Sequence, residues 1–489
     1  MSVRFPNPGP LAAASFIVLA GCAGSGMTPA PAPYSARVQL PQSAPSSPIH
    51  AYYIGDGSND SFYLSDLRTG ADGRLYFALN GLNLSPTNGE IGWFDPRSHT
   101  QRFVYTNVYE PAFIQESGDG SVWVSEFNNA SGQPTIDRYA GIGGKVTPIA
   151  IPVGPFNGGP YNGLNAEMAV APDGAVWFGS DQSSQIGTID PSTNAVTVYN
   201  ISAPNEPWGA VPQYMTMGSD GALWVSDFFN DGVYRVATAG PSKGTSTFSQ
   251  LPQGPWSSTK AEYALGLREG GDGKLYVAGN GQNGGFVDRA PVSANPSFKP
   301  MPRPALDPQS SLIAAGGGKV YFNDNHYSSL GVYDVASKRT VFLPLEGAID
   351  SLPIQYGGPV AVDASGTPYV GCIANGSTCI ESITLTATWN VFPGTSVVFP
   401  GKDPYGNPLP SGMIGIGETG NSGPFSVAAK GNCDAAIIKG FDHDIQVNPL
   451  AIGKCTLAIT DAHARTVHVS IDIVNGSFQP PAYVPKPKS

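Results

Sequence analysis

Charged residues are scarce in this sequence. Asp, Glu, Lys and Arg make up 13 % of the 489 residues, roughly half of the usual share of about 25 %. Basic residues are the scarcer sign, with 26 Lys and Arg against 37 Asp and Glu and a formal charge of −11. Because such a chain lacks a basic stripe that could neutralise phosphates, we expect no nucleic-acid partner.

Long apolar runs and long helices are also missing. No stretch reaches the roughly 20 apolar residues that a transmembrane helix needs. The chain instead contains 61 glycines and 46 prolines, residues that interrupt helices and favour turns. Since 41 % of the residues are hydrophobic and 10 % are aromatic, a packed core is still expected. The composition therefore predicts an all-β protein with short strands and many turns.

A short apolar run near the N-terminus has the features of a secretory signal. Residues 11–20 (LAAASFIVLA) are too few to span a membrane and follow a single basic residue, Arg4. The run leads into Leu19-Ala20-Gly21-Cys22, which resembles the bacterial lipobox, in which the cysteine receives a diacylglycerol. This resemblance implies a lipoprotein signal peptide at residues 1–21 and lipidation at Cys22. An ordinary signal peptide followed by an unrelated cysteine is the alternative.

The predicted anchor sets the expected location of the protein. A lipidated Cys22 would hold the chain on a membrane without a transmembrane helix. We therefore expect an extracytoplasmic protein of the bacterial cell envelope, attached to the outer membrane where the cell has two. Residues 22–48 and 478–489 are rich in proline, which favours an extended chain. They are predicted to be a tether and a tail.

The cysteine count agrees with an oxidising compartment. With Cys22 assigned to the anchor, four of the five cysteines remain, and they form two pairs that are close in sequence. These pairs predict two disulfides, Cys372–Cys379 and Cys433–Cys455. Free buried thiols or a metal site are the alternatives, although no histidine lies near either pair at ligand spacing.

One motif recurs seven times between residues 61 and 371: a glycine-rich turn, often Asp-Gly, followed by an alternating strand with a central aromatic residue. Asp-Gly suits a tight hairpin because both residues tolerate positive φ. The intervals of 45 to 54 residues match one four-stranded blade each. The central aromatics, which can pack between neighbouring blades, are Tyr76, Trp123, Trp177, Trp224, Tyr276, Tyr321 and Tyr369.

These units predict a seven-bladed β-propeller over residues 49–383, closed so that no strand edge stays exposed. The last unit lacks a fourth strand, whereas residues 50–54 (HAYYI) form a strand without a blade. We expect this N-terminal strand to complete the seventh blade. Residues 384–477 contain short strands without the aromatic repeat. They resemble bacterial immunoglobulin-like repeats and predict a small Ig-like β-sandwich.

The blade motif, x-Asp-Gly-x-hydrophobic-Trp-hydrophobic followed by Ile-Gly-x-hydrophobic-Asp, resembles that of the virginiamycin B lyase (streptogramin lyase) family. The resemblance covers residues 50–383 and is most specific in the second to fourth units. It implies a site at which a divalent cation polarises a lactone while a histidine removes the proton whose loss opens the ester. That histidine lies eleven residues before the blade aromatic.

This chain departs from the family at the position of that histidine. The only histidine of the inner blade region is His326, five residues after Tyr321, and it is the remaining candidate for a catalytic base. The sequence therefore favours a protein without the lyase reaction. The residues at the family position are Ser65, Ala112, Ala166, Gln213, Leu265, Ser310 and Gly358.

Acidic residues follow the blade aromatic at the position where the resemblance implies a metal-binding carboxylate. Glu126, Asp227 and Asp324 lie three residues after it, and Asp181 lies four residues after it. Together with His326 they could hold Ca²⁺ or Mg²⁺ at the channel mouth through oxygen ligands. The alternative is that these acids are separate, solvated carboxylates on loops.

Tyrosines gather before the inner strands on the same predicted face. Their flat rings would suit stacking on a sugar or peptide, although tyrosine is also a common packing residue between blades. These candidates for ligand contact are Tyr109, Tyr161, Tyr214, Tyr263 and Tyr356.

Two functions from different classes remain after these steps. The first is an envelope-anchored binding module for a glycan, peptide or protein, which we expect to be a monomer. The second is a divalent-metal-dependent lyase or lactonase acting at the channel mouth. We expect no nucleotide or flavin, because the G-x-G-x-x-G match at residues 279–284 runs back into a β pattern without a helix.

Overall fold

The computed structural model contains an all-β chain in the part that it describes, where every regular element is a strand. Within the same part, no helix is long and apolar enough to cross a membrane. The described residues are 48–54, 62–81, 89–108, 111–126, 134–141, 143–152, 167–179, 184–201, 209–228, 230–252, 263–281, 284–301, 310–324, 329–345, 358–374, 377–386, 388–400, 411–420 and 422–474. The predicted signal peptide, Cys22 and most of the predicted tether lie outside them, as does the tail.

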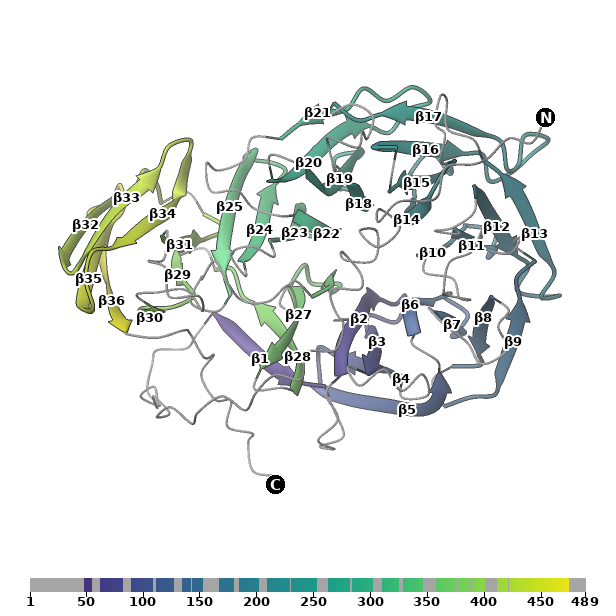
Figure 1. Ribbon diagram of the computed structural model, residues 1–489, viewed down its shortest axis with the longest axis horizontal. Coiled ribbons are helices and arrows are strands. Elements are labelled where there is room, and N and C mark those ends of the chain that lie inside the picture. Colours follow the sequence, from purple (N-terminus) through teal and green to yellow (C-terminus); the bar gives the residue numbers. More distant parts are fainter. Residues whose placement is uncertain are drawn as a thin grey trace, which may run out of the picture.

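Residues 49–383 form seven four-stranded sheets, arranged in a ring around a common centre (Figure 1). The first strand of each sheet lies nearest the centre and contacts the first strands of both neighbouring sheets, so the ring closes. These first strands are β2 (Phe62–Thr69), β6 (Pro111–Glu116), β10 (Met168–Val170), β14 (Pro212–Met217), β18 (Tyr263–Glu269), β22 (Ser310–Gly316) and β26 (Val360–Val362).

The other strands follow outward in chain order, each antiparallel to its neighbour. The second strands are β3 (Leu75–Gly81), β7 (Val122–Glu126), β11 (Val176–Gly179), β15 (Leu223–Asp227), β19 (Lys274–Gly281), β23 (Lys319–Asp324) and β27 (Pro368–Ala374). The third strands are β4 (Gly89–Asp95), β8 (Thr135–Tyr139), β12 (Gln185–Ile189), β16 (Gly232–Val236), β20 (Gly284–Pro291), β24 (Ser329–Asp334) and β28 (Ser377–Ile383). The fourth strands are β5 (Thr100–Val108), β9 (Val146–Ala150), β13 (Val196–Asn200), β17 (Ser246–Gln250), β21 (Lys299–Pro300), β25 (Arg339–Pro344) and β1 (Ile49–Tyr53).

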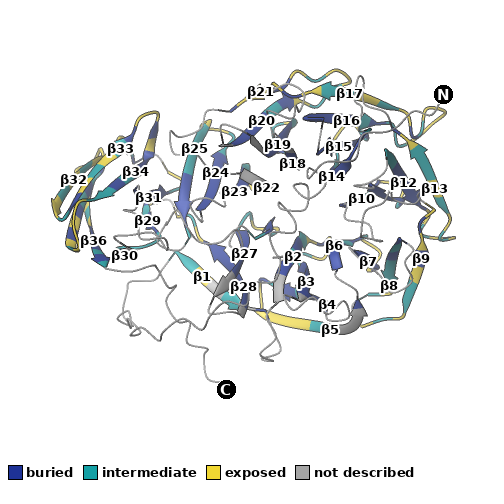
Figure 2. Ribbon diagram, in the orientation of Figure 1, coloured by how far each residue is buried: buried dark blue, intermediate teal, exposed yellow. Residues whose placement is uncertain are grey.

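The N-terminal strand closes the ring as the sequence predicted. β1 pairs with β28 as the outermost strand of the last sheet, with Ile49 opposite Ile383 and Tyr53 opposite Cys379. The first and last segments of the ring therefore share one sheet. Burial decreases outward, from buried first and second strands to fourth strands such as β13 and β17 that are half-buried or exposed (Figure 2).

Each sheet turns sharply between its first and second strands, at the repeated motif. The turn needs a backbone with φ between +67° and +88°, which an L side chain rarely adopts and glycine adopts freely. This requirement explains the recurrent glycine. The seven turn glycines are Gly73, Gly120, Gly174, Gly221, Gly273, Gly318 and Gly366.

The aromatic residue of the second strand packs back on this turn. Its polar atom donates to the turn aspartate in three sheets, in the pairs Tyr76 Oη to Asp72 at 3.0 Å, Trp224 Nε1 to Asp220 at 3.2 Å and Tyr276 Oη to Asp272 at 3.1 Å. The Asp-Gly dipeptide therefore supplies both the backbone of the turn and an acceptor for the aromatic side chain.

Both predicted disulfides are confirmed. Cys372 on β27 lies directly opposite Cys379 on β28, with their Cα atoms 4.8 Å apart. Cys433 and Cys455 bridge two different sheets of the C-terminal part, with their Cα atoms 5.7 Å apart.

Residues 390–474 form two further four-stranded sheets that share one apolar core. The short strands that the sequence predicted for this part are present, and β30 pairs with β36 in parallel. One sheet contains β29 (Asn390–Phe392), β31 (Gly412–Gly417), β34 (Phe441–Pro449) and β33 (Cys433–Ile438), and the other contains β30 (Ser396–Pro400), β36 (Thr466–Val474), β35 (Gly453–Thr460) and β32 (Ser426–Gly431).

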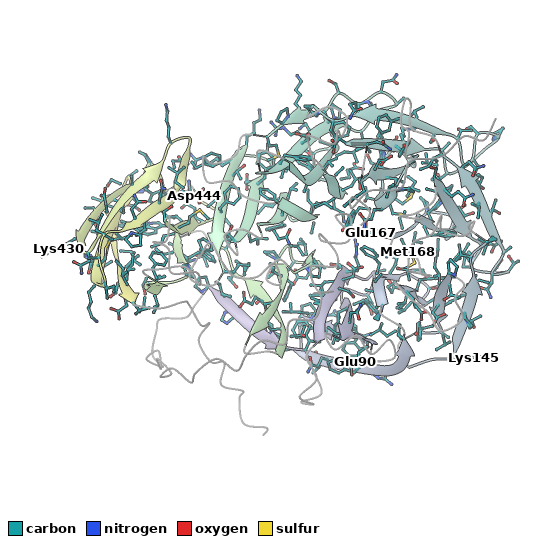
Figure 3. All side chains as sticks on the ribbon, in the orientation of Figure 1. Glu90, Lys145, Glu167, Met168, Lys430 and Asp444 are labelled. Carbon is teal, nitrogen blue, oxygen red and sulfur yellow. A yellow bond between two sulfur atoms is a disulfide. The ribbon has the colours of Figure 1, made fainter. Side chains whose placement is uncertain are left out.

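This double sheet packs against the outer strand β25 of the ring. Phe342 of β25 joins Met413 and Phe441 of the double sheet in one buried cluster. A Cβ atom on Gly415 would lie 2.0 Å from the Phe342 carbonyl oxygen, so a glycine is required at this close approach. Asp444, labelled in Figure 3, accepts the Phe342 backbone N–H at 3.0 Å.

Asp444 is a buried carboxyl group with one hydrogen bond. It is fully buried, and its second oxygen, Oδ2, has no hydrogen-bond partner among the described residues. Burial raises the pKa of Asp444 well above its ordinary value of 3.8, since only the Phe342 N–H opposes the loss of hydration. The folded protein therefore binds a proton here that the unfolded chain releases.

We expect Asp444→Asn to remove a pH dependence of stability. Because the folded pKa is raised, stability is greatest below about pH 4 and falls as the pH rises toward the folded pKa, with a slope of up to about 1.4 kcal/mol per pH unit. Asparagine keeps the acceptor for Phe342 and cannot ionise. Urea unfolding from pH 4 to 8 should show a shallower slope for the variant and equal or greater stability at pH 7.

The matched control is Asp434→Asn, which changes an exposed carboxylate of the adjacent strand β33. It should leave the slope of the wild type unchanged. A wild-type slope that persists in Asp444→Asn would mean that another group carries the pH dependence.

Candidate functional site

Three of the four acids singled out from the sequence lie at one face of the ring, where the second strands end and the first strands begin. Glu126 is opposite Pro111, Asp227 is opposite Pro212, and Asp324 is opposite Ser310. Asp181, His326, Tyr109, Tyr161 and Tyr356 lie outside the described residues, and so do the side chains of Asp324 and Tyr263.

Asp227 belongs to a buried hydrogen-bond network. Its Oδ2 accepts from Asn230 Nδ2 at 2.6 Å and from the Tyr234 hydroxyl at 2.8 Å, while its Oδ1 accepts the backbone N–H groups of Val211 and Asn230 at 3.2 Å each. Burial raises the pKa of Asp227, and these donors oppose the rise. Within the structure, this carboxyl group ties the start of β14 to the end of β15.

Glu126 is also buried, and a second carboxyl group lies beside it. Burial raises the pKa of Asp137 on β8, and a side-chain hydrogen bond with Glu126 opposes the rise. Among the described residues, no group of three or more His, Cys, Asp or Glu side chains could hold a metal ion. Because the side chains of Asp181 and Asp324 are not described, the cation site of this face stays a prediction.

Residues at the family's histidine position pack or bond within the ring wherever the structure describes them. The Ser65 hydroxyl donates to the carbonyl oxygens of Ala78 at 3.1 Å and Pro111 at 2.6 Å. Gln213 is buried, and its Oε1 has no partner in the described part of the chain. Tyr214, a candidate for ligand contact, is buried and packs edge-on against Phe113 with ring centroids 5.8 Å apart.

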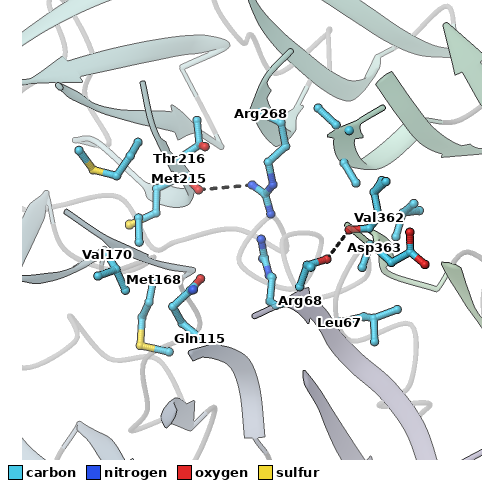
Figure 4. Close-up of a pocket in the computed structure, with 18 of the residues that line it drawn as sticks. Leu67, Arg68, Gln115, Met168, Val170, Met215, Thr216, Arg268, Val362 and Asp363 are labelled. Atoms are coloured by element: carbon cyan, nitrogen blue, oxygen red, sulfur yellow. Dashed lines mark hydrogen bonds between the residues drawn. The ribbon is translucent and has the colours of Figure 1, made fainter. Parts of the chain in front are cut away.

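A cavity of about 490 Å³ lies at the centre of the ring (Figure 4). All seven first strands line it. In every sheet, the first-strand residue that pairs with the blade aromatic of the second strand lines this cavity. These seven residues, one from each sheet, lie at the same depth of the channel and form one level of its lining. These residues are Arg68, Gln115, Ala169, Thr216, Arg268, Ala314 and Ala361.

Arg68 and Arg268, the two charged residues of this level, meet on one buried carboxylate. Glu167 precedes β10 in a third sheet and lies near the centre of the ring in Figure 3. Its Oε1 bonds Nη2 of Arg268 at 2.5 Å and Nη2 of Arg68, while its Oε2 accepts from Nη1 of Arg268 at 3.0 Å. The Met215 N–H donates to the same Oε2 at 2.6 Å.

A second buried carboxylate, that of Asp66, also bonds Arg68. Both oxygens of Asp66 lie 3.0 Å from Nε of Arg68, and Oδ2 also accepts the Ile114 N–H at 3.0 Å. Asp66 and Glu167 are 3 % and 1 % exposed and do not line the cavity, whereas both arginines do. The channel therefore presents guanidinium groups whose counter-charges are buried behind them.

None of the residues of this cluster was predicted from the sequence, although the sequence contains a signal for it. Arg68 and Arg268 both lie eight residues before a blade tyrosine, and Asp66 and Glu167 both lie ten residues before a blade aromatic. Equal offsets in a repeat place side chains at one level of a channel. The cluster offers hydrogen-bond donors in fixed positions, and both oxygens of its central carboxylate are already occupied. Such an arrangement suits holding a ligand better than transferring a proton.

Comparison with known proteins supports the ring fold and identifies the family. The model of the virginiamycin B lyase family matches residues 58–342. A solved streptogramin B lyase has a TM-score of 0.52 at 17 % identity, covering 69 % of this chain and 98 % of the lyase. A catalytically inactive virginiamycin B lyase from Staphylococcus aureus with quinupristin has a TM-score of 0.51 at 16 % identity, covering 69 % of this chain and 100 % of the lyase. No curated protein was found to match the sequence.

We expect Glu167→Gln to destabilise the ring. The substitution leaves two guanidinium groups facing each other without the carboxylate between them, and breaking a buried ion pair costs about 3 kcal/mol. The loss should be visible as a lower midpoint of urea unfolding.

Glu269→Gln serves as the matched control. The Glu269 carboxylate accepts the Ser219 N–H at 2.5 Å, and glutamine keeps an acceptor for it, so the expected cost is below about 1 kcal/mol. Equal losses of stability in the two variants would show that the ion pairs of Glu167 with the two arginines contribute no more than the single hydrogen bond of Glu269.

Proposed function

The chain belongs to the virginiamycin B lyase family, and from this premise we propose that it is an envelope-anchored binding protein that does not open streptogramins. The observation that carries the proposal is the channel, where a cavity of about 490 Å³ is lined by two arginines already paired to a buried carboxylate. Cavities of this volume are typical of small-molecule sites. None of the residues at the family's histidine position is histidine.

We assign residues 49–383 to a seven-bladed β-propeller and residues 384–477 to an Ig-like β-sandwich. The ring of four-stranded sheets, the pairing of β1 with β28 and the shared fold of the lyase structures support the propeller. The two sheets joined by Cys433–Cys455 support the sandwich. The sandwich would give the protein a second surface for an envelope glycan, peptide or protein.

The proposed location rests on the N-terminal sequence. The lipobox-like motif ending at Cys22 supports a signal peptide over residues 1–21, and the proline-rich residues 22–48 would hold the propeller away from the membrane. The two disulfides agree with an oxidising compartment outside the cytoplasm.

The alternative function is a divalent-metal-dependent lyase or lactonase. The family relationship favours it, and so does the pair of carboxyl groups formed by Glu126 and Asp137 at the face where the first strands begin. Such an enzyme would need a base other than the family histidine, with His326 as the candidate.

We expect purified protein to show no streptogramin opening at concentrations where a family enzyme converts all of its substrate. The physical reason is the missing general base, whose loss costs about 10²- to 10⁴-fold in rate. The ring-opened product is an isomer of the substrate, so the assay separates the two by liquid chromatography, with added magnesium or calcium and, separately, after treatment with a chelator. Metal-dependent turnover that is lost in His326→Ala would establish the alternative.

We expect Cys22→Ser to release the protein from the membrane fraction. Serine cannot form the thioether to a diacylglycerol, and the sequence offers no other apolar run of the roughly 20 residues that a span needs. Fractionation followed by immunoblotting measures the distribution, and Ser25→Ala is the control that leaves the motif intact. A variant that still needs detergent for extraction would contradict the anchor.

A further inference from the structure

One level of the channel is formed by the seven first-strand residues that pair with the blade aromatics. It contains two cationic residues and five small or neutral ones. Arg68 and Arg268 come from sheets on different sides of the ring, and their tips point toward each other in the cavity (Figure 4). Gln115 and Thr216 share this level. Donors thus converge at one depth of the channel.

Both guanidinium groups are held in place by contacts that leave part of each group available. Arg68 uses Nε and Nη2 for its two carboxylates, and Arg268 uses Nη1 and Nη2 for Glu167 and for the carbonyl oxygens of Leu267 and Met215. Within the described residues, Nη1 of Arg68 and Nε of Arg268 make no hydrogen bond. Donors fixed in advance lower the cost of ordering side chains when a ligand binds.

Most of the remaining lining is apolar, apart from Thr69 and Asp363. Three methionines and three valines surround the arginine level and add no charge: Met168, Met215, Met217, Val170, Val360 and Val362. Thioether side chains adapt to aliphatic groups of varied shape. The cavity therefore combines a cationic spot with an adaptable apolar wall.

We propose that this cavity binds a small aliphatic monocarboxylate, with its carboxylate on Arg68 and Arg268 and its tail against the methionines and valines. This inference rests on the proposed binding function and names the class of its ligand. A carboxylate has two acceptor oxygens, so it can accept from Nη1 of Arg68 and from Nε of Arg268 together. The site lies along the inner strands, away from the face that carries Glu126 and Asp227.

The net charge of the arginine cluster favours a carboxylate ligand over a more highly charged anion. The two arginines are balanced by Glu167 and Asp66, so the cluster is neutral before a ligand enters. Asp363, also in the lining, is bonded to its own turn through Ser365 and Thr367. A single negative charge can use the remaining donors, whereas a phosphate dianion would meet repulsion from these carboxylates.

Calorimetric titration of the intact protein with hexanoate and with its uncharged analogue hexanamide tests the proposal at low ionic strength. Hexanoate should bind at least about tenfold more tightly than hexanamide, because charge-assisted hydrogen bonds form with the carboxylate alone. Arg268→Met should weaken hexanoate at least about tenfold and leave hexanamide unchanged. Arg235→Met, which changes an arginine bonded to Asp220 outside the cavity, is the matched control.

Folding of each variant is checked by circular dichroism. If Arg268→Met does not fold, Arg268→Lys keeps the charge but loses the Nε–H donor, so its preference for hexanoate over hexanamide should lie between that of the wild type and none. Equal binding of the two probes, binding of neither at millimolar concentration, or wild-type affinity in the Arg268 variant would overturn the proposal. Binding of a glycan or peptide in its place would leave the binding function standing, whereas streptogramin turnover would overturn that function.

Discussion

The turn between the first and second strand of each sheet is the constraint on which the ring depends. A glycine with positive φ lets the chain reverse within a few residues, and in three sheets the aspartate beside it accepts a hydrogen bond from the aromatic residue of the second strand. The turn sets the register of the first two strands. As a result, the residue opposite each aromatic faces the channel in every sheet.

The same register places an arginine cluster in the channel through small departures from the repeat. Seven equivalent positions line one level of the cavity, and arginine occupies those of the first and fifth sheets. Their shared partner, Glu167, comes from the third sheet, at the position that Asp66 occupies in the first. A closed ring brings together residues that are 101 positions apart in the chain, such as Glu167 and Arg268.

Much of the fold could be predicted from the sequence because its determinants are local. Asp-Gly turns, alternating strands and cysteines seven positions apart act over a few residues, and the strands, the β1–β28 pairing and both disulfides are confirmed. The arginine cluster could not be predicted in this way, since its contacts depend on how the ring closes. Asp227 shows a further limit of prediction from the sequence. Its local sequence does not distinguish a buried carboxyl group that ties two strands together from an acid that faces solvent.

The charges in the channel are not explained by stability. Burying the Glu167 carboxylate and most of the two arginine side chains costs several kcal/mol in lost hydration, and apolar side chains of similar volume often stabilise a fold at least as well. The repeat already places alanine at three of the seven equivalent positions, so the ring closes without charge there. Arg68, Glu167 and Arg268 are therefore better explained by a requirement of the channel itself. The carboxylate ligand that we propose, which needs cationic donors in fixed positions inside a protein, would be such a requirement.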